Sequence, residues 1–578
     1  MTISGSPTRS PASPGWLYGP VPDLVLGCGL GSMIVMASLA VWGSAISAII
    51  PGALLILLFA LPHYGATLLR VYELPEDRHK YSLFAVWCTL AIAICFVIGL
   101  HSALVGSLIL TIYLTWSPWH YTGQNYGIFL ILLGRRGVAV EPLTKRLVYL
   151  SFLFSYALAF LAIHGVERSA NYAPVSYAGT VFQLIPLALP SSLFTPLIYA
   201  SVVGYAACLI GAIALLLRAG SLSQIAPALV VFATQALWFS VPVLARFWVG
   251  ADATRMFGAV YSAYGFLWIA AAHSLQYLWI TTYYATSSGD RAQPGQWGVR
   301  LRYLASVAFA GFAIWTLPVL IFAPGVLGSL PHESGLALLL AATVNLHHFV
   351  LDGVVWKLRD GRVAQVLLRR GAPEGPVTAS VPRRGISWPS RAVWATGALC
   401  VVVGLGALWE EDIGFRRSLA TGDTARARTA VDRLTMLGRD GPRRRTQLGR
   451  ELARDGNYRA ARIQFARGLE LQPTSDGWQA MGLLYEQGAE WLRAAQAYGA
   501  ALELDPDNAT LHYKSGLCWL EAGDPERAIA GFEAAAAIAP NQKLIRLSLE
   551  RARREAARAT PRREAGSDGE AAETGSQP

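Results

Sequence analysis

The chain has 578 residues, of which 53% are hydrophobic and only 15% are charged, and its mean hydropathy is +0.39. This composition excludes a single soluble domain and favours a membrane protein with a soluble part attached. Lys and Arg, which give the formal charge of +11, gather in loops beside apolar segments and in the C-terminal third. They predict membrane topology and contacts with lipid headgroups rather than nucleic-acid binding.

Apolar segments long enough to cross a bilayer recur from residue 23 onward. Spanning the hydrocarbon core takes about 20 mainly apolar residues, and on that measure the sequence predicts eleven transmembrane helices. The fourth is too long for one straight span, and Pro118 within "TWSPWHYTG" predicts a kink or break there. The eleven windows lie at 23–42, 46–70, 81–100, 102–133, 147–165, 193–217, 224–245, 256–284, 303–323, 334–356 and 391–409.

The flanking segments complete the predicted domain organisation. Residues 1–22 are expected to form a flexible N-terminus that lacks the features of a cleaved signal peptide, so the first helix is expected to stay as an anchor. Loops rich in Lys and Arg share one side if the N-terminus is cytoplasmic, and eleven spans then put the C-terminal part in the periplasm. The predicted parts are a transmembrane His-rich bundle at 23–356, a basic cytoplasmic loop at 357–390, a last transmembrane helix at 391–409, helical repeats at 410–559 and a disordered tail at 560–578.

Beyond the last apolar window the composition becomes that of a soluble protein, and a repeat appears. Pro473, Pro506 and Pro540 are separated by 33 and 34 residues. Small residues and one aromatic residue recur at fixed offsets before each proline, as close packing of paired helices requires. One set breaks its pattern with an alanine in place of glycine. The sets are Gly449, Gly482 and Gly516; Gly456, Ala489 and Gly523; Ala461, Ala494 and Ala528; and Phe465, Tyr498 and Phe532.

On these residues the segment 442–541 resembles the tetratricopeptide repeat (TPR) family, and "WQAMGLLYEQGAEWLRAAQAYGAALELDP" is the unit most similar to it. Arg445 and His512 depart from the pattern at the position where Trp478 supplies an aromatic ring. The resemblance implies an α-solenoid of stacked helix pairs whose concave surface binds a protein or peptide. The expected fold class is therefore all-α: a polytopic transmembrane helical bundle followed by a TPR-like α-solenoid.

Histidines inside the apolar part are the main candidates for chemistry. Four of them lie seven to fourteen residues from the predicted cytoplasmic ends of four different helices, which is roughly 10–21 Å at ~1.5 Å per residue. The sequence therefore predicts that His63, His120, His273 and His348 converge at a similar depth. An ionisable residue within a membrane segment is by default a candidate functional residue.

Three of these histidines are followed, three or four residues later, by a residue that can hydrogen-bond from the same helix face. A metal-bound imidazole needs such a partner for its second nitrogen. The pairs are His120 with Gln124, His273 with Gln276, and His348 with Asp352. The predicted metal-site residues are His63, His120, His273, His347, His348 and Asp352, with Gln124 and Gln276 as supporting residues, and no residue is assigned a catalytic role.

Three interpretations of this cluster stay open. A transition-metal centre is the first, since neutral imidazole binds iron and copper, and histidines with a carboxylate suit non-haem iron, with haem as a variant. A proton or substrate pathway is the second, and hydrogen-bonded helix packing is the third. The cluster is similar in composition to His-rich integral membrane oxygenases and desaturases, although their HxxxH and HxxHH boxes are absent.

Eleven helices exceed what an anchor requires, which favours chemistry or transport over a scaffold. The expected function is a metal-dependent oxidoreductase of the bacterial inner (cytoplasmic) membrane that uses iron or copper and acts on a lipid-soluble substrate. The expected partners are membrane lipids, that substrate, and a protein or peptide bound by the TPR-like module, and not nucleic acid. The alternatives are a non-enzymatic membrane scaffold or assembly factor, and a transporter, in which the repeats recruit partners.

Overall fold

A computed structural model shows a chain that is almost entirely helical and divides into two compact units. The first unit comprises residues 1–176, 180–318 and 337–404, and the second comprises 177–179, 319–336 and 405–578. The residues that the structure describes are 15–50, 52–72, 79–165, 175–177, 180–249, 263–287, 297–322, 335–357, 361–368, 388–437 and 439–570.

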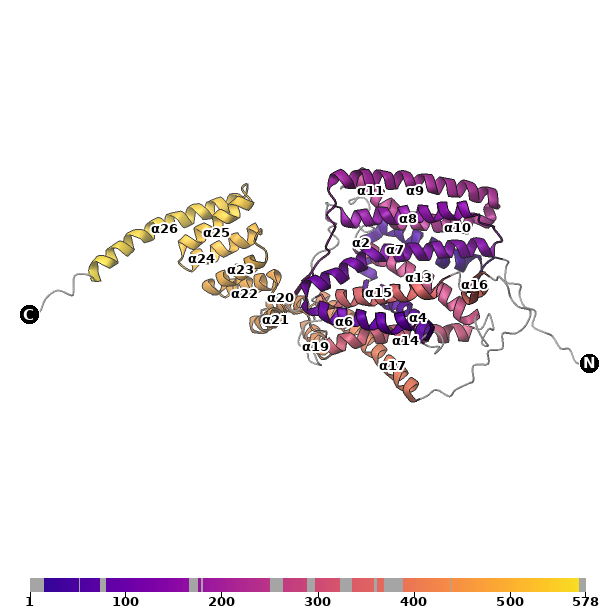
Figure 1. The fold of residues 1–578 in the computed structure, drawn as a ribbon. Coiled ribbons are helices and arrows are strands. Elements are labelled where there is room, and N and C mark those ends of the chain that lie inside the picture. The colour runs from indigo at the N-terminus through magenta and orange to yellow at the C-terminus, as the bar shows by residue number, and fades with distance from the viewer. Residues whose placement is uncertain are drawn as a thin grey trace, which may run out of the picture. The chain divides into compact units, whose positions relative to one another are not determined.

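The first unit is a helical bundle. Helices α7 (Ala103–Arg135), α8 (Pro142–His164) and α9 (Ser191–Ala219) lie side by side in it (Figure 1). A small sheet of β1 (Val175–Tyr177) and β2 (Thr180–Phe182) follows α8. The other helical elements are α1 (Pro20–Pro22), η1 (Asp23–Gly27), α2 (Leu30–Ile49), α3 (Gly52–Leu55), η2 (Ile56–Ala60), α4 (Leu61–Tyr72), η3 (Leu83–Cys88), α6 (Thr89–His101), α10 (Leu222–Gln235), η4 (Ala236–Ser240), α11 (Val241–Val249), α13 (Ala263–Ser287), α14 (Trp297–Phe322), α15 (Leu336–Val355), α16 (Gly361–Leu368) and α17 (Trp388–Trp409).

Aromatic packing between helices holds α7 in the bundle. Phe129 of α7, Phe152 of α8 and Phe232 of α10 are buried, and the ring centroid of Phe232 lies 4.7 Å from that of Phe129 and 5.5 Å from that of Phe152. Close contacts of this kind gain dispersion energy and specify how helices pack, also within a lipid phase. They fix α7, the helix that carries His120.

The expected number of membrane spans is corrected by the structure. Every one of the eleven predicted windows contains helix, but only five described helices are long and apolar enough to cross a membrane, or six if the bent pair of Pro20–Gly27 and Leu30–Gly43 is one span. Helices α7 and α13 are not among the five. Both contain Trp, His, Gln and Thr residues, which lower their mean hydropathy.

The expected break at Pro118 does not occur. Helix α7 runs through this proline without interruption and is 33 residues long in total. Hydroxyl groups on the same helix bond carbonyl oxygens nearby: Ser117 donates to the carbonyl oxygen of Tyr113 at 2.7 Å, and Thr122 donates to that of Pro118 at 2.6 Å. Neither bond reaches the carbonyl oxygen of Leu114, which loses its helix N–H partner at Pro118, and α7 remains one element despite that loss.

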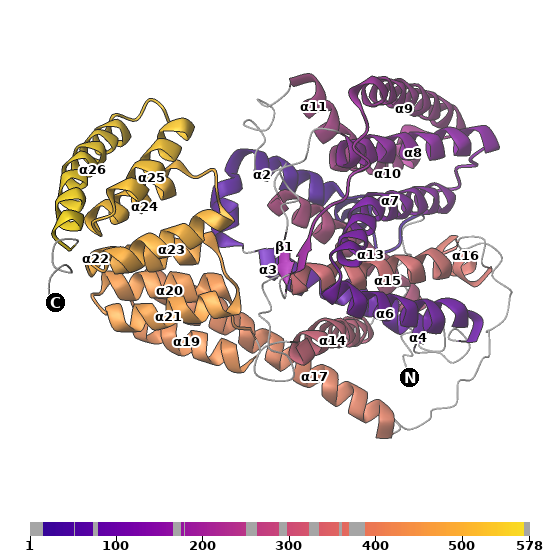
Figure 2. The ribbon, with the colours of Figure 1, turned by 60° about the vertical axis from the view of Figure 1, so that its left-hand side comes forward.

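The second unit contains the predicted repeat as stacked helix pairs (Figure 2). Side chains of Asn457, Thr474 and Asp524 accept hydrogen bonds from backbone N–H groups and so cap three of its helices. The pairs are α20 (Pro442–Arg454) with α21 (Tyr458–Leu471), α22 (Ser475–Gln487) with α23 (Trp491–Leu504), and α24 (Ala509–Glu521) with α25 (Pro525–Ile538). The elements η5 (Glu410–Arg416), α18 (Arg417–Ala420) and α19 (Thr424–Met436) precede them, and α26 (Lys543–Glu570) follows.

The repeated glycines and aromatic residues are direct partners. A Cβ atom added to Gly482 would lie 2.8 Å from the ring of Tyr498, and one added to Gly516 would lie 2.9 Å from the ring of Phe532. A Cβ atom on Gly449 would overlap the ring of Phe465 in the same way. The aromatic ring of each second helix therefore lies on the glycine of the first helix, and the predicted helical repeat is confirmed.

Arg445, which departs from the TPR pattern, is part of a buried polar group. Its guanidinium donates to both carboxylate oxygens of Asp440, at 2.9 and 2.7 Å, to Oε1 of Gln464 at 2.9 Å, and to Oγ1 of Thr435 at 2.9 Å. Asp440 is fully buried and Arg445 is only 7% exposed. A paired charge therefore occupies the position that an aromatic ring takes in the next unit.

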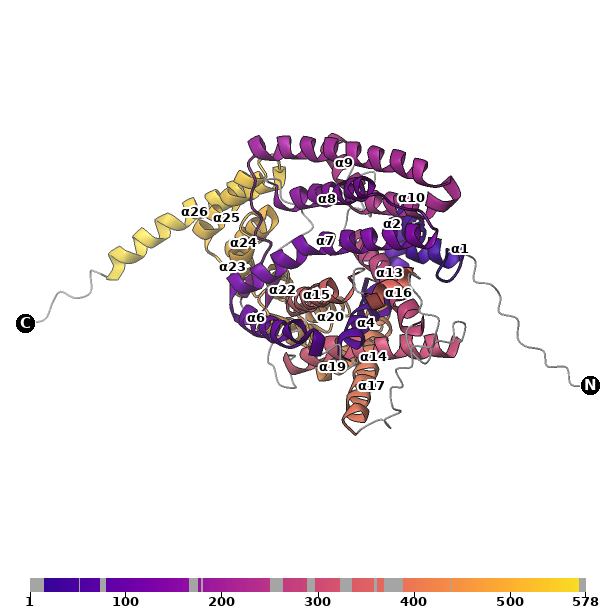
Figure 3. The ribbon, with the colours of Figure 1, turned by 45° about the vertical axis from the view of Figure 1, so that its right-hand side comes forward.

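Two predicted segments contain more helix than expected. Helix α16 lies within the segment 357–390, and the rest of that segment up to residue 387 is largely outside the described residues. Helix α26 runs to Glu570 as one long element (Figure 3), past residue 560, where the tail was expected to begin. The positions 571–578 lie outside the described residues.

Candidate metal centre

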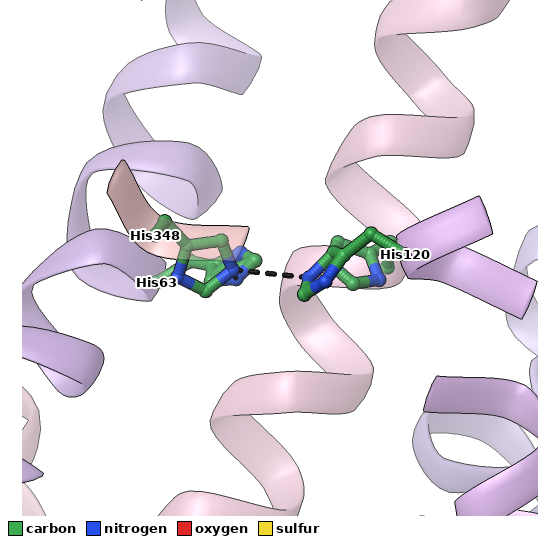
Figure 4. Close-up of side chains that lie close together, drawn as sticks. His63, His120 and His348 are labelled. Atoms are coloured by element: carbon green, nitrogen blue, oxygen red, sulfur yellow. Dashed lines mark hydrogen bonds between the residues drawn. The ribbon is translucent and has the colours of Figure 1, made fainter. Parts of the chain in front are cut away.

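Four histidine rings from four helices converge in the first unit. His63 lies on α4, His120 on α7, His273 on α13 and His348 on α15, and one ring nitrogen of each lies within 4.8 Å of those of the other three. Figure 4 shows the rings of His63 and His348 turned toward that of His120. Three rings are buried, and the side chain of His120 is 11% exposed. The structure thus brings together the four histidines for which the sequence predicted a common depth.

The shortest distances in this cluster join ring nitrogens to one another. Nε2 of His348 lies 2.7 Å from Nε2 of His63 and 3.1 Å from Nε2 of His120. A hydrogen bond between two neutral imidazoles needs a proton on one nitrogen and a lone pair on the other. The hydrogen bonds at the Nδ1 atoms decide which rings have a proton to give.

We assign the Nδ1–H tautomer to His63 from its contact with α13. Its Nδ1 lies 3.1 Å from Oγ of Ser274, and this hydroxyl donates its only proton to the carbonyl oxygen of Ala270 at 2.8 Å. Ser274 can therefore only accept from the ring. The proton of His63 is thus on Nδ1, and its Nε2 points into the cluster with a bare lone pair.

The same argument applies to His348. Its Nδ1 lies 2.8 Å from Oγ1 of Thr67, which also contacts the hydroxyl of Tyr277 at 2.7 Å and Oδ1 of Asp352 at 3.0 Å. The Tyr277 hydroxyl lies 2.6 Å from that Oδ1. Thr67 donates its single hydroxyl proton to the carboxylate of Asp352, so toward the ring it can only accept, from Nδ1–H. His348, like His63, points a bare Nε2 into the cluster.

His273 lies in the cluster without a hydrogen bond to either ring nitrogen. Its Nδ1 and Nε2 are both buried and have no hydrogen-bond partner among the described residues. Its ring stacks on Tyr121 with centroids 4.0 Å apart and lies 4.8 Å from that of His63 and 5.0 Å from that of His120. A buried polar group without a partner is costly, so an orphaned imidazole calls for a ligand.

Asp352 adds a carboxylate to the same space. Its Oδ1 accepts from Tyr277 and Thr67, which hold the side chain in place. Its Oδ2 lies 3.4 Å from Nε2 of His348 and 3.9 Å from Nε2 of His120. One oxygen is therefore anchored by the protein, while the other faces the histidine nitrogens.

Three predicted residues play other parts. His347 turns away from the cluster, and its Nε2 lies 2.9 Å from Oγ1 of Thr89. The side-chain amide of Gln124 donates to the backbone carbonyl oxygen of His273 and to Oε1 of Gln276, each at 3.1 Å, and Gln276 donates to the carbonyl oxygen of Gly27. The two glutamines therefore join helix backbones and do not orient an imidazole ring.

The groups that orient the rings were not among the predicted residues. Ser274 of α13 holds His63 of α4, and Thr67 of α4 holds His348 of α15. Each partner comes from a helix other than that of its histidine, so same-helix spacing does not reveal it. One signal was present in the sequence: Thr67 lies four residues after His63 and follows it on the same helix face.

The arrangement favours a cation. Lone pairs of His63 and His348 that meet at 2.7 Å repel each other unless a positive charge lies beside them. Neutral imidazole nitrogens bind transition metals at about 2.0–2.1 Å, and a set of several imidazoles with one carboxylate suits iron and copper as well as zinc.

Comparisons with known proteins do not identify a function for this chain. No protein family and no curated protein sequence matches the chain. Among solved structures, the crystal structure of the APC/C hetero-tetramer Cut9-Hcn1 is similar, with 16% sequence identity and a TM-score of 0.23, and the match covers 64% of this chain. The chain spans 65% of the length of that protein chain. At this TM-score the likeness carries no argument about fold or function.

Proposed function

We propose that the first unit holds a transition-metal centre within an apolar membrane bundle. Its ligands would be His63, His120, His273 and His348, with Oδ2 of Asp352 as a carboxylate ligand. The observation that carries the proposal is the 2.7 Å distance between the Nε2 atoms of His63 and His348, both of which we assign as unprotonated from their Nδ1 contacts. A bound metal would replace this repulsion by bonds to both nitrogens, and it would give the orphaned His273 ring a partner as well.

The hydrogen bonds around the centre support a metal more than plain packing. A metal-bound imidazole commonly donates its other N–H to an oxygen, which fixes the tautomer and the ring orientation. His63 and His348 both do so, toward Ser274 and Thr67. Helix packing alone would instead be satisfied by pairing each ring nitrogen with a donor or acceptor, and His273 lacks such a pair.

With iron or copper this ligand set would support oxidation or reduction, which zinc would not. Histidines with a carboxylate suit non-haem iron, and imidazoles suit copper. The metal, when bound, would supply the redox step. The residues of this chain would hold it, exclude water and keep a carboxylate beside it. We therefore propose a metal-dependent oxidoreductase of the inner membrane that acts on a lipid-soluble substrate.

The helical repeat of the second unit favours a second activity, which is protein binding. Stacked helix pairs present an extended surface that commonly accepts a peptide or protein segment. We propose that this module recruits a protein partner to the membrane enzyme. In a scaffold or a transporter the same module would serve recruitment, and the histidine cluster would then carry no metal.

Elemental analysis of detergent-purified protein tests the metal centre. We expect iron or copper near one equivalent per chain, and loss of most of it in His120→Ala and in His348→Ala. His347→Ala is the matched control, because His347 is buried next to His348 yet bonds Thr89 outside the cluster. It should keep the metal, and circular dichroism should show that all three variants stay folded.

Metal-free wild-type protein that remains folded, even after incubation with iron or copper, would rule out the centre. Equal metal loss in His347→Ala and His348→Ala would show that the bundle, and not the ligand set, had been disturbed.

A further inference from the structure

A cavity of about 340 Å³ adjoins the histidine cluster between α7, α13, α15 and α16. His120, Asp352 and Tyr277 line it, so it reaches the reactive part of the first unit. All three also belong to the hydrogen-bonded or ring-stacked network of the centre. A molecule in this cavity would contact the same groups that surround the proposed metal.

The rest of the lining is almost entirely apolar. Trp116, Trp119, Phe349 and Trp356 supply aromatic surface, isoleucine and leucine side chains add aliphatic surface, and Gln124 is the one further polar side chain. Among the described residues that line the cavity, none is Lys or Arg. Such a lining disfavours an anion, because no basic side chain is present to neutralise it. The one carboxylate, that of Asp352, is engaged by Tyr277, Thr67 and His348 and not by the apolar wall, so the wall favours an uncharged ligand.

Three glycines also line the cavity. Gly123 and Gly127 lie one helical turn apart on α7, and Gly353 lies on α15. A Cβ atom added to any of them would meet nothing within 4 Å. Gly123 and Gly353 are exposed, whereas Gly127 is half-buried. The cavity is therefore open to the surface beside Gly123 and Gly353.

We infer that this cavity is the binding chamber for an uncharged, mainly apolar small molecule, which enters between Gly123 and Gly353 and reaches His120 and Asp352 with its inner end. The inference names the substrate class of the proposed oxidoreductase and rests on that function only for the reaction, not for binding. The volume is more than twice the ~150 Å³ cavity that holds one benzene molecule. The bound part of the ligand is therefore about two fused rings or an equally bulky piece of a longer hydrocarbon.

Photolabelling with an aryl diazirine, a small uncharged aromatic probe, tests the chamber in full-length protein. Excess unlabelled probe separates saturable labelling from general labelling of apolar surface, and mass spectrometry locates the labelled peptides. We expect saturable labelling within 116–131 and 349–356. Gly127→Leu, which fills the chamber from α7, should reduce it at least tenfold.

Gly406→Leu is the matched control, because Gly406 is an exposed helical glycine of α17 with nothing within 4 Å of an added Cβ atom. It should label like wild type. Wild-type protein with no saturable labelling in these peptides, or unchanged labelling in Gly127→Leu, would overturn the inference. If Gly127→Leu also lowers metal content, Gly353→Leu enters the same cavity from α15, and persistent labelling there overturns the inference.

The metal content of the same samples separates the two proposals. Saturable labelling of folded protein that stays metal-free after incubation with iron or copper would keep the chamber and overturn the metal centre. Metal-loaded protein without saturable labelling would keep the centre and overturn the chamber.

Discussion

Gly65 of α4 and Gly311 of α14 bring these two helices into backbone contact. A Cβ atom on Gly65 would overlap the carbonyl oxygen of Val307, and one on Gly311 would overlap that of Leu61. Neither obstacle is a side chain that could rotate away, so any larger residue must push the helices apart. His63 lies two residues before Gly65, and this contact therefore helps to set the position of its ring.

Gly311→Ala is expected to weaken the proposed centre although it touches no ligand. Inserting one methyl group into a tight contact typically costs about 1–3 kcal/mol, through shifts of the surrounding structure, and a shift of α4 moves His63. We expect a lower melting temperature and at least a tenfold weaker affinity for the metal. Gly298→Ala, at an open position of the same helix, should change neither. Full retention of metal and stability in Gly311→Ala would show that α4 is positioned by other contacts.

Thr67→Val should lower metal affinity through the ring of His348. Valine has nearly the shape of threonine but cannot accept the Nδ1–H bond, now 2.8 Å long. Loss of such an outer partner commonly reduces metal affinity 10–100-fold, and competition with a chelator of known affinity would measure it. Thr89→Val removes the matching partner of His347 and should leave affinity unchanged. Equal affinities in the two variants would contradict the role given to Thr67.

The sequence allowed the convergence of the four histidines to be predicted, because depth along a helix depends only on rise per residue. The direction in which each ring points could not be predicted in the same way. His347 and His348 are adjacent, about 100° apart on the helix, and only the packed neighbours decide that His348 faces the cluster. The ring partners Ser274 and Thr67 were not predicted, because each lies on a different helix from the histidine that it holds. Residue spacing indicates contacts only within one helix.

The repeat was predictable in finer detail than the membrane part. Its period fixes which residues meet, and the Gly482–Tyr498 contact is the one that the spacing suggests. The membrane count was too high because several helical windows are less apolar than a membrane span. In α13, His273, Ser274 and Tyr277, which belong to the centre or hold its groups, lower the mean hydropathy. The apolar windows therefore located helices correctly but overstated how many meet the criteria of a membrane span.

Breaking the Arg445–Asp440 pair is expected to destabilise the start of the repeat. Asp440→Asn leaves the guanidinium of Arg445 buried without its counter-charge, and removing one partner of a buried ion pair typically costs about 3–5 kcal/mol. Hydrogen exchange measured by mass spectrometry should be faster in peptides of α20 and α21 and unchanged in α25. The exposed pair of Arg467 and Glu470 is the control, because Glu470→Gln should cost under about 1 kcal/mol. Unchanged exchange in Asp440→Asn would mean that Gln464 and Thr435 suffice to satisfy Arg445.

Ala489 stands at a position of the repeat where the other two units have glycine. Its φ is +56°, against +76° at Gly456 and +83° at Gly523. The same hydrogen bonds recur at all three helix ends: Asn457, Glu490 and Asp524, the residues that follow, donate their backbone N–H to carbonyl oxygens five residues back at 2.8–2.9 Å. The turn therefore imposes the left-handed conformation, whatever residue stands there.

Ala489→Gly is consequently expected to stabilise the module. The left-handed conformation costs an L-residue about 1–2 kcal/mol. Glycine avoids this cost but loses about 0.5–1 kcal/mol more conformational entropy on folding than alanine does. A net gain of about 0.5–1 kcal/mol should slow amide exchange in α22 and α23 by roughly two- to fivefold, where exchange requires opening of that pair. Gly456→Ala imposes the opposite change where an added Cβ atom meets nothing within 4 Å, and should speed exchange in α20 and α21. Exchange that moves in the same direction in both variants would show that side-chain packing, and not the backbone conformation, controls these turns.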